Sequence, residues 1–236
     1  AEHVTFSYGK ETILSDVSVK IPKHSVVGIV GRSGSGKSTL LKLLMRFWDV
    51  QKGSVTLSGT RVADINTKKL REMESFVTQE THLFHDSIKN NLRIAKLTAT
   101  DEEIEAACKK ASVHDFIMTL PQGYDTLLDE TVSLSQGQKQ LLCIARVLLC
   151  DPQILILDEA TSSIDTRTEL LVQSAFDQMM QGRTSFIVAH RLSTIEQADR
   201  ILVMNHGQIL EQGSHHELLK QGGFYSQLYN SQFAGE

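Results

Sequence analysis

Hydrophobic and polar residues alternate at the start of the chain, over residues 3–8 and again over 16–21. Such alternation is typical of strands with one buried and one exposed face, so it predicts an antiparallel sheet at the N-terminus. Residues 25–30 instead form a run of mostly valine and isoleucine, which indicates a strand buried on both faces. Alternation returns over 53–59, and residues 74–79 are another short candidate strand.

From residue 80 to residue 150 the pattern is helical, with a wide apolar stripe over 138–149. Two further apolar runs, at 154–157 and 184–188, indicate buried strands, and a helical stretch at 166–180 separates them. Strands that alternate with helices predict an α/β fold with a mostly parallel sheet.

The composition is that of an ordinary globular protein, with 41% hydrophobic and 22% charged residues among 236 and a net charge of −4. These values exclude a disordered or collagen-like chain, and the mild acidity argues against a nucleic-acid partner. The apolar runs are far shorter than the ~20 residues that cross a bilayer. Three cysteines without metal-type spacing predict reduced thiols. We therefore expect a soluble domain.

The sequence GRSGSGKS, which follows the first buried strand, fits the phosphate-loop pattern G-x-x-x-x-G-K-S. Its glycines allow backbone amides to surround phosphate oxygens at a helix N-terminus. Lys37 is predicted to reach the β- and γ-phosphates, and the Ser38 hydroxyl to bind Mg²⁺. A chance glycine turn is disfavoured because the motif lies between a buried strand and the helical stretch 38–47. The predicted nucleotide-binding residues here are Gly31, Arg32, Ser33, Gly34, Ser35, Gly36, Lys37, Ser38 and Thr39.

An acidic pair, Asp158 and Glu159, follows the buried strand 154–157. Parallel sheets bind ligands at the carboxyl ends of their strands, so this pair is placed for chemistry. Asp158 is predicted to help hold Mg²⁺, and Glu159 to polarise an attacking water. The alternative is an acidic helix start that only stabilises a helix dipole, and the phosphate loop disfavours it.

Residues 134–138 have the sequence LSQGQ and stand directly before the apolar stripe of the predicted helix. Ser135 is a good N-cap, and Gly137 allows close approach to the backbone. Alone they indicate only a helix start. Placed a short way before the acidic pair, they resemble the ATP-binding cassette (ABC) ATPases, whose signature begins LSGGQ.

The resemblance covers nearly the whole chain. Tyr8 matches the aromatic residue that stacks on adenine in this family. Gln79 matches the Q-loop glutamine, a magnesium contact, and residues 162–165 resemble the D-loop. His190 resembles the switch histidine that binds the γ-phosphate, and with Glu159 it is expected to position water. Each could alone be an ordinary surface residue, but their common order favours the family.

The resemblance implies a RecA-like P-loop NTPase fold, in which a mostly parallel sheet carries an N-terminal antiparallel β-subdomain and an inserted α-helical subdomain. One nucleotide-binding domain is expected, with 1–79 and 151–236 as the ATP-binding core and 80–150 as the helical subdomain with the signature. ATP and Mg²⁺ are the expected cofactors. The resemblance makes Lys37, Glu159 and His190 catalytic.

The exporter branch of the family is similar to this chain at residues 76–80, 83–84, 87–91 and 123–126. That branch implies transmembrane domains ahead of residue 1 in the same full-length chain, and a position at the cytoplasmic face of the cell membrane. Gln136 departs from the family's glycine, and LSQGQ resembles subunits of heterodimeric bacterial multidrug exporters. The expected partner is a second nucleotide-binding domain, either identical or different.

Two alternatives to an exporter remain open. One is a soluble ABC ATPase of DNA repair or translation, which a long coiled-coil insertion or a second cassette would indicate; this sequence contains neither. The other is a nucleotide-gated dimerisation clamp with little hydrolysis, which the presence of Glu159 and His190 disfavours.

Overall fold

The computed structural model describes residues 1–77, 81–129, 132–158, 165–188 and 195–232. Contacts divide the chain into two compact units, of which the first holds 1–76, 154–159 and 182–236. The second holds 77–153 and 160–181. The helical stretch 166–180 therefore groups with the second unit. The predicted division into an ATP-binding core, 1–79 and 151–236, and a helical subdomain, 80–150, stays a prediction.

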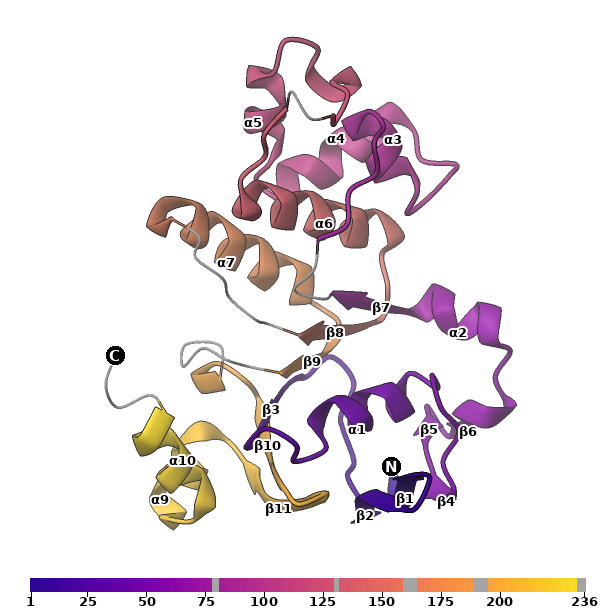
Figure 1. Ribbon diagram of the computed structural model, residues 1–236, viewed down its shortest axis with the longest axis vertical. Helices are drawn as coiled ribbons and strands as arrows, with labels where there is room; N and C mark the ends of the chain where they lie inside the picture. The colour runs from indigo at the N-terminus through magenta and orange to yellow at the C-terminus, as the bar shows by residue number, and fades with distance from the viewer. Residues whose placement is uncertain (78–80, 130–131, 159–164, 189–194, 233–236) are drawn as a thin grey trace. The chain divides into compact units, whose positions relative to one another are not determined.

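A six-stranded sheet lies at the centre of the first unit, in the order β11–β10–β3–β9–β8–β7 (Figure 1). Four neighbouring strands are parallel: β10 (Arg200–Asn205), β3 (Val26–Val30), β9 (Thr184–Val188) and β8 (Ile154–Asp158). β11 (Gln208–Gly213) pairs antiparallel with β10, and β7 (Glu74–Val77) is the other edge. The mostly parallel sheet is confirmed, and its central strands are the continuous apolar runs that burial on both faces requires.

A smaller antiparallel sheet opens the chain, with β1 (Glu2–Tyr8) between β2 (Glu11–Val17) and β4 (Lys52–Ser54). The predicted strand at 16–21 is wrong in its position. A turn at residues 9–10 pairs Tyr8 directly with Glu11, so β2 begins at once and ends at Val17. The alternation at 53–59 is divided between β4 and β5 (Thr56–Leu57), which pairs with β6 (Thr60–Arg61).

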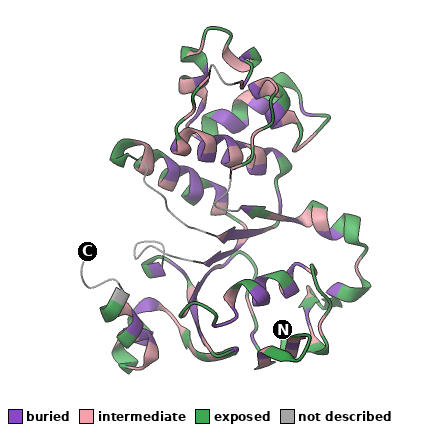
Figure 2. Cartoon of the chain, viewed as in Figure 1, coloured by how far each residue is buried: buried purple, intermediate pink, exposed green. Residues whose placement is uncertain are grey.

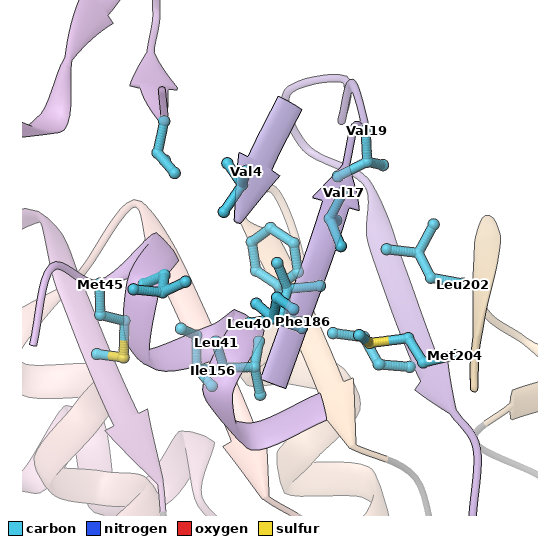
Figure 3. Close-up of a cluster of buried hydrophobic side chains, with 14 of the residues drawn as sticks. Val4, Val17, Val19, Leu40, Leu41, Met45, Ile156, Phe186, Leu202 and Met204 are labelled. Carbon is cyan, nitrogen blue, oxygen red and sulfur yellow. The ribbon is translucent and has the colours of Figure 1, made fainter. Parts of the chain in front are cut away.

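The helix α1 (Lys37–Leu44) shares one hydrophobic core with the antiparallel sheet and one face of the central sheet (Figure 3). Leu40 is completely buried in this core and Leu41 almost so. Phe186 of β9 and Val4 of β1 belong to the same cluster. Because α1 follows the glycine loop directly, its burial fixes where that loop ends.

The other face of β3 and β10 is covered by α9 (His215–Gln221) and α10 (Phe224–Gln232). Successive residues of β3 and β10 point to opposite faces, as in any strand. Ile29 and Leu202 therefore belong to the α1 side, and Val30 and Val203 to the α9–α10 side. The sequence pattern predicted neither α9 nor α10.

The second unit is helical. Its principal members are α3 (Ile88–Arg93), α4 (Asp101–Lys110), α5 (His114–Thr119), α6 (Gln136–Cys150) and α7 (Thr166–Met180). α6 packs against α3, α4 and α7, and Figure 2 shows its buried side. The chain also contains α2 (Thr67–Met73) and the short 3-10 turns Val62–Asp64 and Gly123–Asp125. Within the described ranges, no helix combines the length and apolar character needed to cross a bilayer.

Glu74 at the start of β7 generates a prediction about pH and stability. Its side chain is 2% exposed and pairs with Arg71, yet burial raises the pKa of its carboxyl from 4.5 to about 7. The folded state then binds more protons than the unfolded state between these values, so this group's stabilising contribution is lost as pH rises through that window. Glu74→Gln cannot ionise, and its stability relative to wild type should increase by up to about 3 kcal/mol between pH 5 and pH 8.

Urea unfolding of both proteins at the two pH values measures this change. Glu72→Gln alters an exposed carboxyl of the same segment and is the matched control, for which no such gain is expected. A stability difference between Glu74→Gln and wild type that stays constant across the two pH values would contradict the assignment.

Candidate functional site

The glycine loop runs from the carboxyl end of β3 to the first residue of α1. Gly31 has a φ of +153° and Gly36 a φ of +100°, which L-residues with side chains rarely adopt. A Cβ atom on Gly31 would lie 2.2 Å from the carbonyl oxygen of Met204, and one on Gly36 would lie 2.8 Å from a methyl group of Leu14. Both glycines are therefore required by the path of the chain.

Lys37 extends its ammonium group back over this loop. Its Nζ donates to the carbonyl oxygens of Gly31, at 2.8 Å, and Arg32, at 2.9 Å, and lies 3.5 Å from the Ser35 hydroxyl. Burial lowers the pKa of Lys37, and the charge of Asp158 opposes this shift. A cation held over a loop that opens a helix is positioned to meet an anionic phosphate.

The other predicted loop residues differ in exposure. Arg32, Ser33, Gly34 and Ser38 are exposed, whereas Ser35 and Thr39 are buried. Asp158 ends β8 at the same edge of the sheet as the loop, because β8, β9 and β3 are parallel. A serine hydroxyl and a carboxylate are the oxygen ligands that Mg²⁺ prefers, and substrate phosphates ordinarily complete such a site. Ser38 and Asp158 therefore fit a magnesium ion that is bound together with a nucleotide.

Tyr8 ends β1 and is 40% exposed. Two other rings pack against it in T-shaped arrangements: Phe6, with centroids 5.0 Å apart, and Trp48, with centroids 5.9 Å apart. Sequence reasoning missed Trp48. Its only signal was a pair of adjacent aromatic residues, Phe47 and Trp48, at the end of the predicted helical stretch 38–47. An exposed, laterally supported ring suits stacking on a flat base.

Ser135 and Gly137 lie in the second unit, at the start of α6. The Ser135 hydroxyl accepts from the Gln138 amide at 3.2 Å, and the Gln138 side chain accepts from the Ser135 amide at 2.9 Å. This capping box confirms the predicted N-cap. Gln136 is the first helical residue and donates from its side chain to the Thr81 hydroxyl at 3.5 Å. Since an ordinary helical φ suits glutamine, its departure from glycine requires no unusual backbone.

Gln79, Glu159 and His190 lie outside the described residues, as do positions 162–164, so their roles stay predictions. Their places in the sequence still constrain them. Glu159 is the residue after β8, and His190 is the second residue after β9. Both therefore follow parallel strands that end at the edge where Lys37 and Asp158 lie.

A family model described as ABC transporter matches residues 14–162. The chain belongs to the ABC transporter family. It is 52% identical over 230 residues to the ATP-dependent lipid A-core flippase of Desulfotalea psychrophila, a match that covers 97% of this chain and 40% of that protein. It is 48% identical over 234 residues to a putative multidrug export ATP-binding/permease protein of Staphylococcus aureus, with 98% and 40% covered.

A solved structure of a bacterial Atm1-family ABC exporter with ATP bound is similar to the chain, with a TM-score of 0.89 and 41% identity. The match covers 98% of this chain and 41% of that one. The expected fold, a P-loop NTPase with an antiparallel N-terminal part and a helical part, is confirmed. The chain spans about 40% of the length of the relatives it matches.

The contact between Tyr8 and Trp48 provides a direct test of nucleotide binding by this ABC domain. Trp48 is the single tryptophan of the chain, so its fluorescence reports on the surroundings of Tyr8. Adding ATP with Mg²⁺ should change the emission in a saturable way. Tyr8→Ala should raise the dissociation constant about fivefold, because aromatic stacking contributes about 1 kcal/mol. Tyr8→Phe keeps the ring and should bind as wild type does; equal affinity of Tyr8→Ala and wild type would exclude a stacking role.

Proposed function

We propose that this chain is the ATP-binding and ATP-hydrolysing lobe of an ABC exporter, which powers substrate export through transmembrane domains. The observation that carries the proposal is the position of Lys37, held over the glycine loop at the edge of the sheet that also presents Asp158. The names of the relatives, a flippase and a multidrug export protein, favour an exporter over a soluble ABC ATPase outside transport.

Hydrolysis of ATP to ADP and phosphate requires charge compensation and a positioned water. Lys37 would compensate charge that develops on the β- and γ-phosphates. Ser38, Asp158 and Gln79 would hold Mg²⁺, which when bound neutralises phosphate charge. Glu159 would polarise the attacking water, and His190 would bind the γ-phosphate and help to place that water. The water oxygen bonds to the γ-phosphorus as the bond to the bridging oxygen breaks.

The signature loop would act on a second copy of the site. In this proposal two nucleotide-binding domains associate head to tail, identical or different, with each ATP between the glycine loop of one and the signature of the other. Ser135 suits this role because its hydroxyl oxygen accepts the Gln138 amide while its own proton stays available to a phosphate. The start of the 15-residue α6 adds a favourable dipole. The assembly would lie at the cytoplasmic face of the membrane.

Two substitutions test the catalytic assignment in the full-length protein that carries this chain. Lys37→Ala should lower ATP turnover by about 10²–10³-fold, since a preorganised charge at the phosphates is lost. Glu159→Gln should lower turnover similarly while ATP stays bound, because the amide keeps its shape but cannot polarise water. Phosphate release and retained radiolabelled ATP measure the two effects. Near-normal turnover of Lys37→Ala would end the proposal.

A pair of substitutions in the signature tests the second-site role. Gly137→Asp places a carboxylate where the backbone approaches phosphate, so it should abolish hydrolysis at the opposite site by bulk and repulsion. Gln136→Gly should change the rate less than about tenfold, or roughly 1.4 kcal/mol in barrier, because Gln136 already has helical geometry. Turnover of the assembled transporter is the measurement. Equal loss in both variants would make Gln136 a working part of the site.

A further inference from the structure

A cavity of about 790 Å³ opens in the first unit at the amino ends of the central strands. Ile154 at the start of β8, Thr184 at the start of β9 and Arg200 at the start of β10 all line it. The glycine loop and Asp158 lie at the opposite, carboxyl ends of the strands. Along β8, Ile154 and Asp158 are separated by about 13 Å, from the rise of a strand. The cavity is therefore distinct from the candidate nucleotide site.

The interior wall of the cavity is apolar. Ile156 of β8 and Phe186 of β9 line it from the central sheet, and Figure 3 shows both in the cluster on the α1 side. The end of α1 and the segment from β5 to the following turn supply further apolar side chains: Leu44, Met45, Val55, Leu57 and Val62. An apolar pocket of this volume is typical of sites that bind small molecules.

The opening of the cavity is cationic. Lys20 and Lys23 line it from the segment between β2 and β3, and both are exposed, so they lie where the cavity meets solvent. Arg200 precedes Leu202 by two residues in β10, so its side chain points to the α1 side of the sheet, as that of Leu202 does. Glu2 is the exposed acidic residue among the described lining residues, and the three cations outnumber it.

Glu74, the other acidic residue in the described lining, is buried and already has a cationic partner. The Arg71 guanidinium donates to its carboxylate and also to the carbonyl oxygen of Met45, at 2.6 Å. A cationic ligand would have to displace Arg71 from both groups. The charge available to a ligand is therefore the positive charge at the opening.

We propose that this cavity binds an anionic amphiphile, a molecule with one carboxylate-type head and a single apolar tail. The head would pair with Lys20, Lys23 and Arg200 at the opening, and the tail would lie against Met45 and Leu57 in the interior. The site goes beyond the proposed function and does not depend on it, because its lining includes neither the phosphate loop nor the acidic pair.

Photolabelling of the full-length protein in nanodiscs tests this site. The probe is dodecanoate with a diazirine at the end of its tail, and the readout is mass spectrometry of tryptic peptides. Labelling of residues 53–61, which include Val55 and Leu57, should be saturable, and excess unmodified dodecanoate should compete. ATP with Mg²⁺ should not compete, and Lys37→Ala should label as wild type does.

The head group is tested with a dodecyltrimethylammonium probe of the same design. Half-saturation by this cation should need a concentration about tenfold higher, because the charges at the opening repel it. Labelling confined to other peptides would overturn the proposal, as would a preference for the ammonium probe.

Two double variants of equal charge test the cationic opening. Lys23→Gln with Arg200→Gln should raise the half-saturating dodecanoate concentration about tenfold, because two ion pairs near the surface are lost. Lys10→Gln with Lys68→Gln is the matched control, since both lysines are exposed and lie outside the lining; it should match wild type. Equal half-saturation in the two double variants would contradict the assigned head site.

Leu57→Trp tests the interior, because the larger ring occupies space at the wall without changing charge. It should remove the saturable labelling of residues 53–61 while the melting temperature stays near that of wild type. A variant that keeps this melting temperature and still labels as wild type does would overturn the proposed tail site. If the variant unfolds instead, the comparison of the two probes on the wild-type protein still decides the proposal.

Discussion

The path of the chain from β3 into α1 is the constraint on which the rest of the first unit depends. β3 is buried on both faces, and Leu40 of α1 is completely buried, so both ends of the glycine loop are fixed by packing. The loop must then pass against the β10–β11 hairpin, where Gly207 donates its amide to the Ser35 carbonyl at 3.1 Å. Only glycine fits at position 31, against Met204 of β10, and at position 36, against Leu14 of β2. The packing of the core and the path of the glycine loop are thus set by the same few residues.

The glycine loop orients and partly buries the ammonium group of Lys37. Removing an ammonium group from water costs free energy, which here is offset by two carbonyl oxygens of the loop and by the field of Asp158. A cation that is already oriented and partly desolvated interacts more strongly with phosphate than a solvated one, because the local dielectric constant is lower. The cost is met during folding, before any ligand arrives.

In the second unit, buried hydrogen bonds join α6 to α3 and to the loop before α3. Asn91 is almost completely buried; its side chain donates to three backbone carbonyls at 84–87 and accepts from the Phe84 amide. Arg146 of α6 donates to both the carbonyl and the side-chain oxygen of Asn91. Together they tie the helix that begins with the signature to α3 and to the loop before it. The body of α6 is therefore held by contacts within the unit, and its start by the capping box.

The sequence by itself determined the features whose signals are local. Runs of mostly apolar residues predicted β3, β8 and β9, and Ser135 predicted the start of α6. The spacing of the glycines and Lys37 predicted a phosphate loop between β3 and α1, where the structure has a tight glycine turn. Each depends on residues within one turn or one strand, where backbone sterics and capping decide the outcome.

The tertiary structure alone decided the contacts between distant segments. The support of Tyr8 by Trp48 and the contact of Phe224 with Arg32 join residues that no local pattern relates. The place of β10 beside β3 likewise follows only from burying both faces of the sheet. The reason is physical: propensity and capping act over a few residues, whereas packing selects partners by shape and burial, regardless of their separation along the chain.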